Sequence, residues 1–239
     1  MTTHKIALVT GGNKGLGLEI ARQLGQQGVT ILLGARDAAK GQQAAAALVK
    51  EGFKAEFLQL DVESDAEIAA AVKTVTAKYG KLDILVNNAG VSTDWGQTPI
   101  SRDSFAKTLN INLIGPWAVT QAFAGLLEAS GQGRVVNHSS ILGSIGTLKS
   151  TDQMDAFFTS AYSTSKAALN MLTVIQAKAL AGKKIKVNAA HPGWVKTDLG
   201  GESAPMEIVD GAKTAVALSL LGEDGPSGGY FHLGKPLSW

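Results

Sequence analysis

Short apolar runs alternate with longer stretches rich in alanine, leucine, lysine and glutamate along most of the chain. Runs such as IALV at 6–9 and DILV at 83–86 have few polar positions, which is typical of strands buried on both faces of a sheet. The longer stretches have a composition that favours helices. The expected strands are 5–10, 29–33, 54–60, 82–87, 134–139, 184–190 and 230–233. The expected helices are 16–27, 37–51, 64–79, 104–129 and 162–180.

The order of these elements predicts the fold class. Repeated strand–helix–strand units favour a parallel sheet covered by helices on both faces. We therefore expect an α/β fold with a doubly wound, mostly parallel sheet of about seven strands. No linker, repeat or low-complexity tract interrupts the pattern, so the 239 residues are expected to form one domain, 1–239.

Composition and charge narrow the classes of protein. The chain is 45% apolar, which is enough for a sizeable core. A net charge of +2 gives no basic field that would attract nucleic acid or an anionic membrane. The absence of cysteine excludes disulfides, thiolate nucleophiles and cysteine-based zinc sites. No signal peptide or membrane span is evident, and a cytoplasmic protein acting on a small molecule is expected.

A glycine-rich turn, TGGNKGLG at 10–17, follows the first expected strand. In an open parallel sheet this turn is where a dinucleotide pyrophosphate binds, because glycines let the backbone approach and the helix N-terminus offers free N–H groups. The spacing of Gly11, Gly15 and Gly17 is looser than the usual G-x-G-x-x-G fingerprint. The interpretation therefore depends on the position of the turn between strand and helix, and a purely structural turn is the alternative.

The end of the second expected strand bears on the choice of dinucleotide. An acid there would bind the ribose hydroxyls of NAD, but the chain has Ala35 followed by Arg36. Asp37 is expected to cap the next helix instead. Arg36 and Lys14 are two cations suited to a 2′-phosphate, which a guanidinium can bind through two N–H groups. We therefore expect NADP(H) as the cofactor, the alternative being that both cations are solvated.

Tyr162 and Lys166 stand four residues apart in an expected helix and so share one face, one turn apart. A free phenol with a pKa of about 10 is a poor acid–base group at neutral pH. A nearby ammonium group favours the phenolate and is expected to lower that pKa. The phenol is then able to give its proton to a carbonyl oxygen. In isolation, such a pair is more often a surface pair on a helix.

A set of motifs, in a fixed order, resembles the short-chain dehydrogenase/reductase family, in particular its carbonyl reductase-like branch. The resemblance extends over 10–198, most of the chain, and implies a Rossmann fold and NADPH-dependent reduction of aldehydes and ketones. The motifs are TGGNKGLG at 10–17, Asp61-Val62, NNAG at 87–90, NLIG at 112–115, NHSS at 137–140, YSTSK at 162–166 and HPGWVKTD at 191–198.

This resemblance assigns roles to particular residues. It implies that Tyr162 donates the proton, that Lys166 also holds the nicotinamide ribose, and that Ser140 rather than Ser139 polarises the carbonyl oxygen. The main-chain carbonyl of Asn112 is implied to bind a water in a proton relay, while the cofactor supplies the hydride. The cofactor contacts, which include Tyr162 and Lys166, are expected to be Gly11, Asn13, Lys14, Gly15, Leu16, Gly17, Arg36, Asp61, Val62, Asn88, Ala89, Gly90, Pro192, Gly193, Val195 and Thr197.

Pro116 gives an independent reason for a free carbonyl at Asn112. Proline has no N–H to donate to the carbonyl four residues earlier, which here belongs to Asn112. A kink near 112–116 is therefore expected within the long helix. A kink that serves packing alone is the alternative.

Substrate contacts are expected from loops beyond the carboxyl ends of the strands. The interval between Ser140 and Tyr162 is longer than is common in the family, which implies a short insertion at about 141–161. Aromatic and methionine side chains in these loops suggest an apolar carbonyl or alcohol substrate. Whether the protein is a monomer or a homo-oligomer stays open. The substrate residues are expected to be Ser140, Ile141, Trp95, Tyr162 and Trp194, with Met154 and Phe157 as further candidates.

Two other classes of function fit parts of the pattern. Sugar epimerases and dehydratases also use a Ser/Tyr/Lys site, but they usually carry a larger substrate domain than the roughly 40 residues after Asp198 could form. A non-catalytic NADP(H)-sensing regulator is the second alternative, although such proteins tend to lose the tyrosine or the lysine. His138 and His191 lack partners at metal-ligand spacing, and no metal site is expected.

Overall fold

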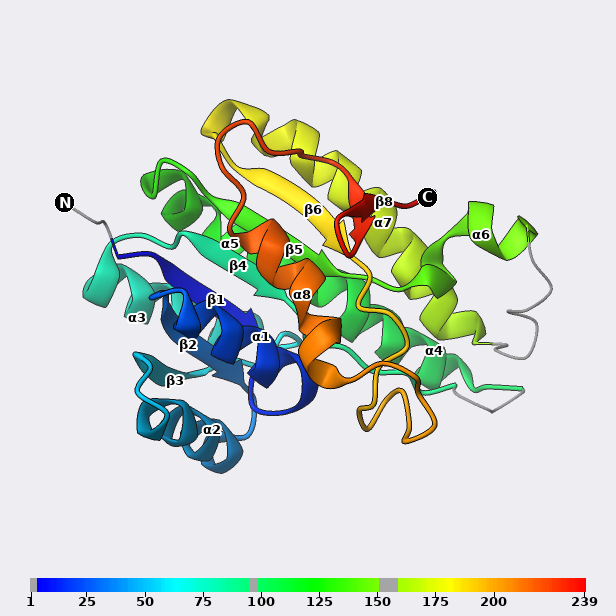
Figure 1. Ribbon diagram of the computed structural model, residues 1–239, viewed down its shortest axis with the longest axis horizontal. Helices are drawn as coiled ribbons and strands as arrows, with labels where there is room; N and C mark the ends of the chain where they lie inside the picture. Colours follow the sequence, from blue (N-terminus) through cyan, green and yellow to red (C-terminus); the bar gives the residue numbers. More distant parts are fainter. Residues whose placement is uncertain (1–3, 95–98, 151–158) are drawn as a thin grey trace.

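The strands form one sheet in the order β3-β2-β1-β4-β5-β6-β7-β8 in the computed structural model, which describes residues 4–94, 99–150 and 159–239 (Figure 1). Neighbouring strands from β3 to β7 are parallel, and the two-residue β8 pairs antiparallel with β7. The mostly parallel, doubly wound sheet is as predicted, with β8 in addition to the expected seven strands. The strands are β1 (Ile6–Thr10), β2 (Thr30–Ala35), β3 (Ala55–Gln59), β4 (Ile84–Asn87), β5 (Arg134–His138), β6 (Lys186–Ala190), β7 (Tyr230–His232) and β8 (Lys235–Pro236).

Helices cover both faces of this sheet (Figure 1). One core forms between the sheet and α3, α5 and α7, and the other between the sheet and α1, α2 and α8. The apolar strands supply both cores, because successive side chains point to opposite faces. The longer helices are α1 (Gly15–Gln26), α2 (Ala38–Lys50), α3 (Asp65–Tyr79), α4 (Arg102–Leu109), α5 (Gly115–Ala129), α7 (Ser160–Leu180) and α8 (Ile208–Ser219). The shorter helical segments are η1 (Asn110–Ile114), η2 (Ile141–Gly143), α6 (Ile145–Ser150) and η4 (Ala181–Lys183).

The strand order reverses at β1, which has β2 on one side and β4 on the other. At such a switch point the loops leave in opposite directions, and a crevice opens at the carboxyl ends of the strands. The turn after β1 and the segment after β4 meet there, since the Thr10 hydroxyl accepts hydrogen bonds from the N–H groups of Asn88 and Ala89, each at 3.0 Å. The fold thus creates a ligand crevice beside the glycine-rich turn.

The helix expected at 104–129 is interrupted. α4 ends at Leu109, η1 is a π-helical turn, and α5 begins at Gly115. In η1 the Gly115 N–H donates to the carbonyl of Asn110, five residues earlier. Pro116 lies in the first turn of α5, where it has no N–H for the bond that a continuous α-helix would make to Asn112. The interruption overlaps the interval in which a kink was expected.

The sequence pattern does not predict α8. Gly211, in its first turn, lowers the helix propensity of that segment. The position nevertheless requires a small residue, because a Cβ there would lie 2.6 Å from the Val195 side chain. Packing of α8 against α1 and β5 therefore outweighs the local preference of the chain.

Candidate active site

Tyr162 and Lys166 lie in the first two turns of α7, and both side chains are buried. The helical spacing brings the Lys166 Nζ to 5.5 Å from the centre of the Tyr162 ring. The same ammonium donates a hydrogen bond to the main-chain carbonyl of His138 at 2.7 Å. Lys166 therefore connects α7 to the carboxyl end of β5.

Burial is the largest influence on the pKa values of Tyr162 and Lys166. It raises the pKa of Tyr162 to about 12, against a smaller lowering by the hydrogen bond with Ser140. It also lowers the pKa of Lys166 to about 8. The expectation that the phenol pKa is lowered is wrong for this structure, because desolvation of the phenolate by burial is the largest influence on it. Tyr162 is consequently a protonated phenol at neutral pH.

The two serines that follow β5 have different surroundings. The Ser139 hydroxyl donates to the Asn170 side chain at 2.6 Å and is fully occupied within the core. Ser140 is hydrogen-bonded to Tyr162, and its hydroxyl also accepts the Leu142 N–H at 3.3 Å. Of the two, Ser140 is the one placed beside the phenol.

Asn112 occupies the π-helical turn, where its side chain is fully buried. Its amide accepts the Val91 N–H at 2.9 Å and donates to the Val91 carbonyl at 2.8 Å and to the Ser165 hydroxyl at 3.0 Å. The sequence interpretation concerned only the main-chain carbonyl of this residue. In the structure the side chain also joins the loop after β4 to α7.

Asp94 is a buried residue that the sequence analysis missed. Its Oδ2 accepts the main-chain N–H of Ala161 at 2.6 Å and that of Tyr162 at 3.4 Å. A carboxylate at this place satisfies free N–H groups of the first turn of α7 and interacts favourably with the helix dipole. Asp94 therefore fixes the end of the helix that carries Tyr162. No sequence signal marks it, because the cap comes from a loop 67 residues away.

The glycine-rich turn has the backbone that its sequence predicts. Gly11 and Gly15 have φ values of +62° and +56°, which side chains rarely adopt. A Cβ at Gly17 would lie 2.5 Å from the Gly11 carbonyl, so the turn closes tightly on α1. Asn88 holds the turn from the other side of the crevice, with its Nδ2 2.9 Å from the Thr10 carbonyl. The N–H groups at the start of α1 are thus available to a pyrophosphate.

The cations of the crevice differ in their partners. Lys14 forms an ion pair with Asp198 at 2.5 Å, which joins the glycine-rich turn to the loop after β6. Within the residues that the structure describes, no group bonds to the exposed guanidinium of Arg36. Asp37 caps α2 as predicted, since its Oδ1 accepts the Lys40 N–H at 3.0 Å. Arg36 is thus free to bind an anion, whereas Lys14 is paired with the Asp198 carboxylate.

The remaining predicted cofactor residues lie in the segments that follow β1, β3 and β4. Val62 packs against Gly115, whose Cβ would lie 2.9 Å from the valine. Asp61 accepts the Glu63 N–H at 3.0 Å, and Asn13 is half-buried in the glycine-rich turn. Gly90 lies close to Lys166, whose Nζ would be 3.7 Å from a Cβ at that position.

A cavity of about 360 Å³ opens between Ser140, Tyr162 and the loop after β6. It brings together predicted cofactor and substrate residues that are far apart in the sequence, and most of its wall is apolar. Leu142, Leu199, Gly200, Ser92 and His191 also line it, although none of them was named as a site residue. The predicted residues that line it are Leu16, Ser140, Ile141, Tyr162, Pro192, Gly193, Trp194, Val195 and Thr197.

Some expected substrate residues fall outside the described part of the chain. These are Trp95, Met154 and Phe157. Of the predicted insertion at about 141–161, the structure describes η2, α6 and the start of α7. Ile141 and Leu142 of η2 line the cavity, so this part of the insertion borders the candidate site.

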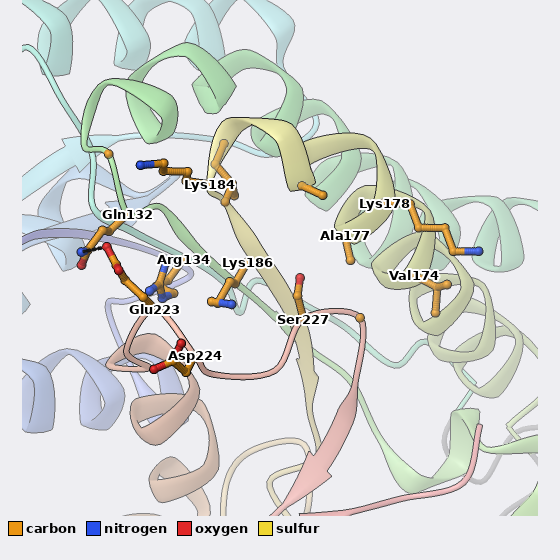
Figure 2. Close-up of a pocket in the computed structure, with 14 residues that line it drawn as sticks. Gln132, Arg134, Val174, Ala177, Lys178, Lys184, Lys186, Glu223, Asp224 and Ser227 are labelled. Carbon is orange, nitrogen blue, oxygen red and sulfur yellow. Dashed lines mark hydrogen bonds between the residues drawn. The ribbon is translucent and has the colours of Figure 1, made fainter.

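A larger cavity, of about 700 Å³, lies at the opposite edge of the sheet, near the amino ends of β5 and β6 (Figure 2). Its polar side chains are largely engaged with the protein. The Arg134 guanidinium donates to the carbonyls of Gly133, Leu221 and Gly222, and Lys186 donates to that of Gly225. These bonds hold the loop after α8 in place. The residues predicted to carry the chemistry, Ser140 and Tyr162, line the smaller cavity.

The described residues contain no cluster of histidine and acidic side chains that could hold a metal ion. None of the helices in the described segments has the length and apolar character needed to cross a membrane.

Comparisons with known proteins place the chain among oxidoreductases. A family model described as short chain dehydrogenase matches residues 5–208. The chain is 33% identical to (+)-neomenthol dehydrogenase of Arabidopsis thaliana, over 96% of each chain. It is 34% identical to carbonyl reductase (NADPH) 1 of Homo sapiens, over 98% of each chain.

Solved structures agree with these sequence relatives. The NADPH-bound carbonyl reductase from chicken fatty liver matches with a TM-score of 0.87 and 29% identity, over 99% of both chains. The likeness therefore extends over nearly the whole of each chain.

Proposed function

The chain belongs to the short chain dehydrogenase family and is an NADP-dependent oxidoreductase, and on this basis we propose that it reduces an aldehyde or ketone to the alcohol. One observation carries the proposal. The Tyr162 phenol, the Ser140 hydroxyl and the Lys166 ammonium converge beside a mostly apolar cavity that adjoins the glycine-rich turn. Two donors to one oxygen, next to a dinucleotide site, suit the reduction of a carbonyl group.

The cofactor is NADP(H), and the residues of the crevice fit it. The positive φ values of Gly11 and Gly15 and the free N–H groups of α1 form a cradle for a pyrophosphate. We assign the 2′-phosphate to Arg36, whose guanidinium lacks a partner among the described residues. When bound, the cofactor supplies the hydride.

The protein supplies the proton and the orientation. Tyr162 stays protonated at neutral pH and gives its phenolic proton to the substrate oxygen, which also accepts a hydrogen bond from Ser140. Lys166, with a pKa of about 8, is able to exchange protons near neutrality and to return one to Tyr162. We assign the water relay that feeds this lysine to the main-chain carbonyl of Asn112.

We infer that the substrate is a small, largely apolar carbonyl compound. Leu16, Ile141, Leu142, Trp194 and Leu199 form most of the wall around the reacting oxygen. Such a wall binds hydrocarbon by removing it from water, while the few polar groups orient the carbonyl.

The experiment is an absorbance assay of NADPH oxidation with a panel of aldehydes, cyclic and aryl ketones and quinones. We expect turnover of several apolar members and much slower turnover with NADH. Tight binding of NADPH without turnover of any member of the panel would contradict the proposed reaction and favour a regulatory role.

A further inference from the structure

Three polar side chains of the 360 Å³ cavity already donate their protons to the protein. The Ser92 hydroxyl donates to Asp94 at 3.3 Å, and that of Thr197 to the Val195 carbonyl at 3.4 Å. The Trp194 Nε1 donates to the Gly200 carbonyl at 2.7 Å. These three groups therefore have no proton left for a ligand.

His191 differs from them. It follows β6 and lines the cavity. Its Nδ1 accepts the main-chain N–H of Ile141 at 3.2 Å and that of Gly193 at 3.4 Å. Burial, and then the neighbouring His232, lower the pKa of His191 to about 3, so the ring is neutral. Because Nδ1 acts as an acceptor, the single ring proton resides on Nε2.

The Nε2–H of His191 has no acceptor among the residues that the structure describes. The bond to Ile141 places the ring next to the residue that follows Ser140. The cavity wall therefore includes a neutral N–H donor near Ser140 and Tyr162, the two groups that we assign to the carbonyl oxygen. A ligand that covers this N–H without offering an acceptor would leave it unpaired in a mostly apolar wall, at a cost in free energy. The site therefore favours a ligand that brings its own acceptor.

We propose that His191 is a specificity-determining residue whose Nε2–H binds a second oxygen of the substrate, a few bonds from the carbonyl that is reduced. The inference rests on the proposed reduction of aldehydes and ketones and names the class of substrate. It favours apolar compounds with a neighbouring neutral acceptor, such as 1,2-diketones and keto esters. A neutral donor in an apolar wall does not compensate a carboxylate for its loss of hydration, so keto acids are disfavoured.

The test compares two substrates that differ in this second oxygen, 1-phenyl-1,2-propanedione and propiophenone. The quantity measured is the ratio of their kcat/KM values, because damage to the fold or to cofactor binding changes both values together. In His191→Asn the short amide retains an acceptor near the position of Nδ1 but has no donor near that of Nε2. We expect the ratio to fall about three- to tenfold, the effect of one hydrogen bond.

Two further variants complete the test. His191→Gln extends an amide donor towards the position of Nε2, and its ratio should stay within about twofold of wild type. His4→Asn changes an exposed histidine that does not line the cavity, and should leave the ratio unchanged. Equal ratios in wild type and His191→Asn, or equal falls in the Asn and Gln variants, would overturn the assignment. Failure of wild type to reduce any carbonyl compound would instead refute the proposed function itself.

Discussion

The carboxylate of Asp94 accepts the main-chain N–H of Ala161 at 2.6 Å, which joins the loop after β4 to the first turn of α7. Both residues are fully buried. The loop contributes Ser92 to the cavity wall, and the helix contributes Tyr162. One hydrogen bond thus relates the cavity wall to the position of Tyr162, which we propose as the proton donor.

Replacing Asp94 by alanine should therefore destabilise the protein and slow the reaction together. The N–H groups of Ala161 and Tyr162 lose their acceptor, at a cost of about 1–3 kcal/mol. Asp94→Asn retains an oxygen acceptor and should lose less stability and less activity than Asp94→Ala. Urea denaturation measures the free energy of unfolding, and kcat reports on the positioning of Tyr162. Asp103→Ala, at an exposed position in the first turn of α4, is the control; equal losses in the two alanine variants would contradict this account.

Arg36 should distinguish NADPH from NADH. A charged hydrogen bond to a phosphate contributes about 1.5–3 kcal/mol, so Arg36→Ala should weaken NADPH binding about tenfold to a hundredfold. The effect of Arg36→Ala on the binding of NADH, which lacks the 2′-phosphate, should be small. Titration of nucleotide fluorescence gives both dissociation constants. Lys50→Ala, at the far end of α2, controls for the loss of a surface cation. Equal weakening of NADPH and NADH binding by Arg36→Ala would rule out the assignment.

His138 should make the folded state sensitive to acid. Burial first, and then Lys166 and His191, lower its pKa to about 3, compared with about 6.5 in an unfolded chain. Between these values the unfolded chain binds a proton that the folded protein does not, so stability falls as the pH drops from 6.5 towards 3. His138→Val removes this binding of a proton on unfolding. Between pH 7 and pH 4 the free energy of unfolding of the variant should therefore fall about 3 kcal/mol less than that of wild type.

Urea denaturation at a series of pH values measures this difference. His4→Val, at an exposed position near the N-terminus, should follow the wild-type curve. Parallel curves for wild type and His138→Val would show that His138 does not control the acid sensitivity.

Local patterns in the sequence predict those parts of the protein that depend on local physics. Asp37 caps α2 because a carboxylate before an alanine-rich helix can reach the free N–H groups. Pro116 marks the interruption of the long helix because it lacks an N–H. The glycines after β1 mark a turn with positive φ, which only a few residue types tolerate.

Features that depend on burial or on distant partners could not be predicted in the same way. The pKa of Tyr162 is raised because the folded chain removes the phenol from water, whereas the sequence showed only the neighbouring lysine. Asp94 and His191 act through loops that meet α7 and β5 only in the folded protein. The sequence spacing therefore predicts the pair to which we assign the reaction, and the tertiary structure adds the groups that contact it.

The most direct test of the central claim is the rate of carbonyl reduction by Tyr162→Phe, measured in single turnover with bound NADPH. The variant removes only the hydroxyl, and fluorescence titration should show NADPH binding within about threefold of wild type. General acid catalysis contributes about 10²–10⁴-fold, so the reduction rate should fall by that factor. A reduction rate within about threefold of wild type, with NADPH bound, would contradict the assignment of Tyr162 as the proton donor.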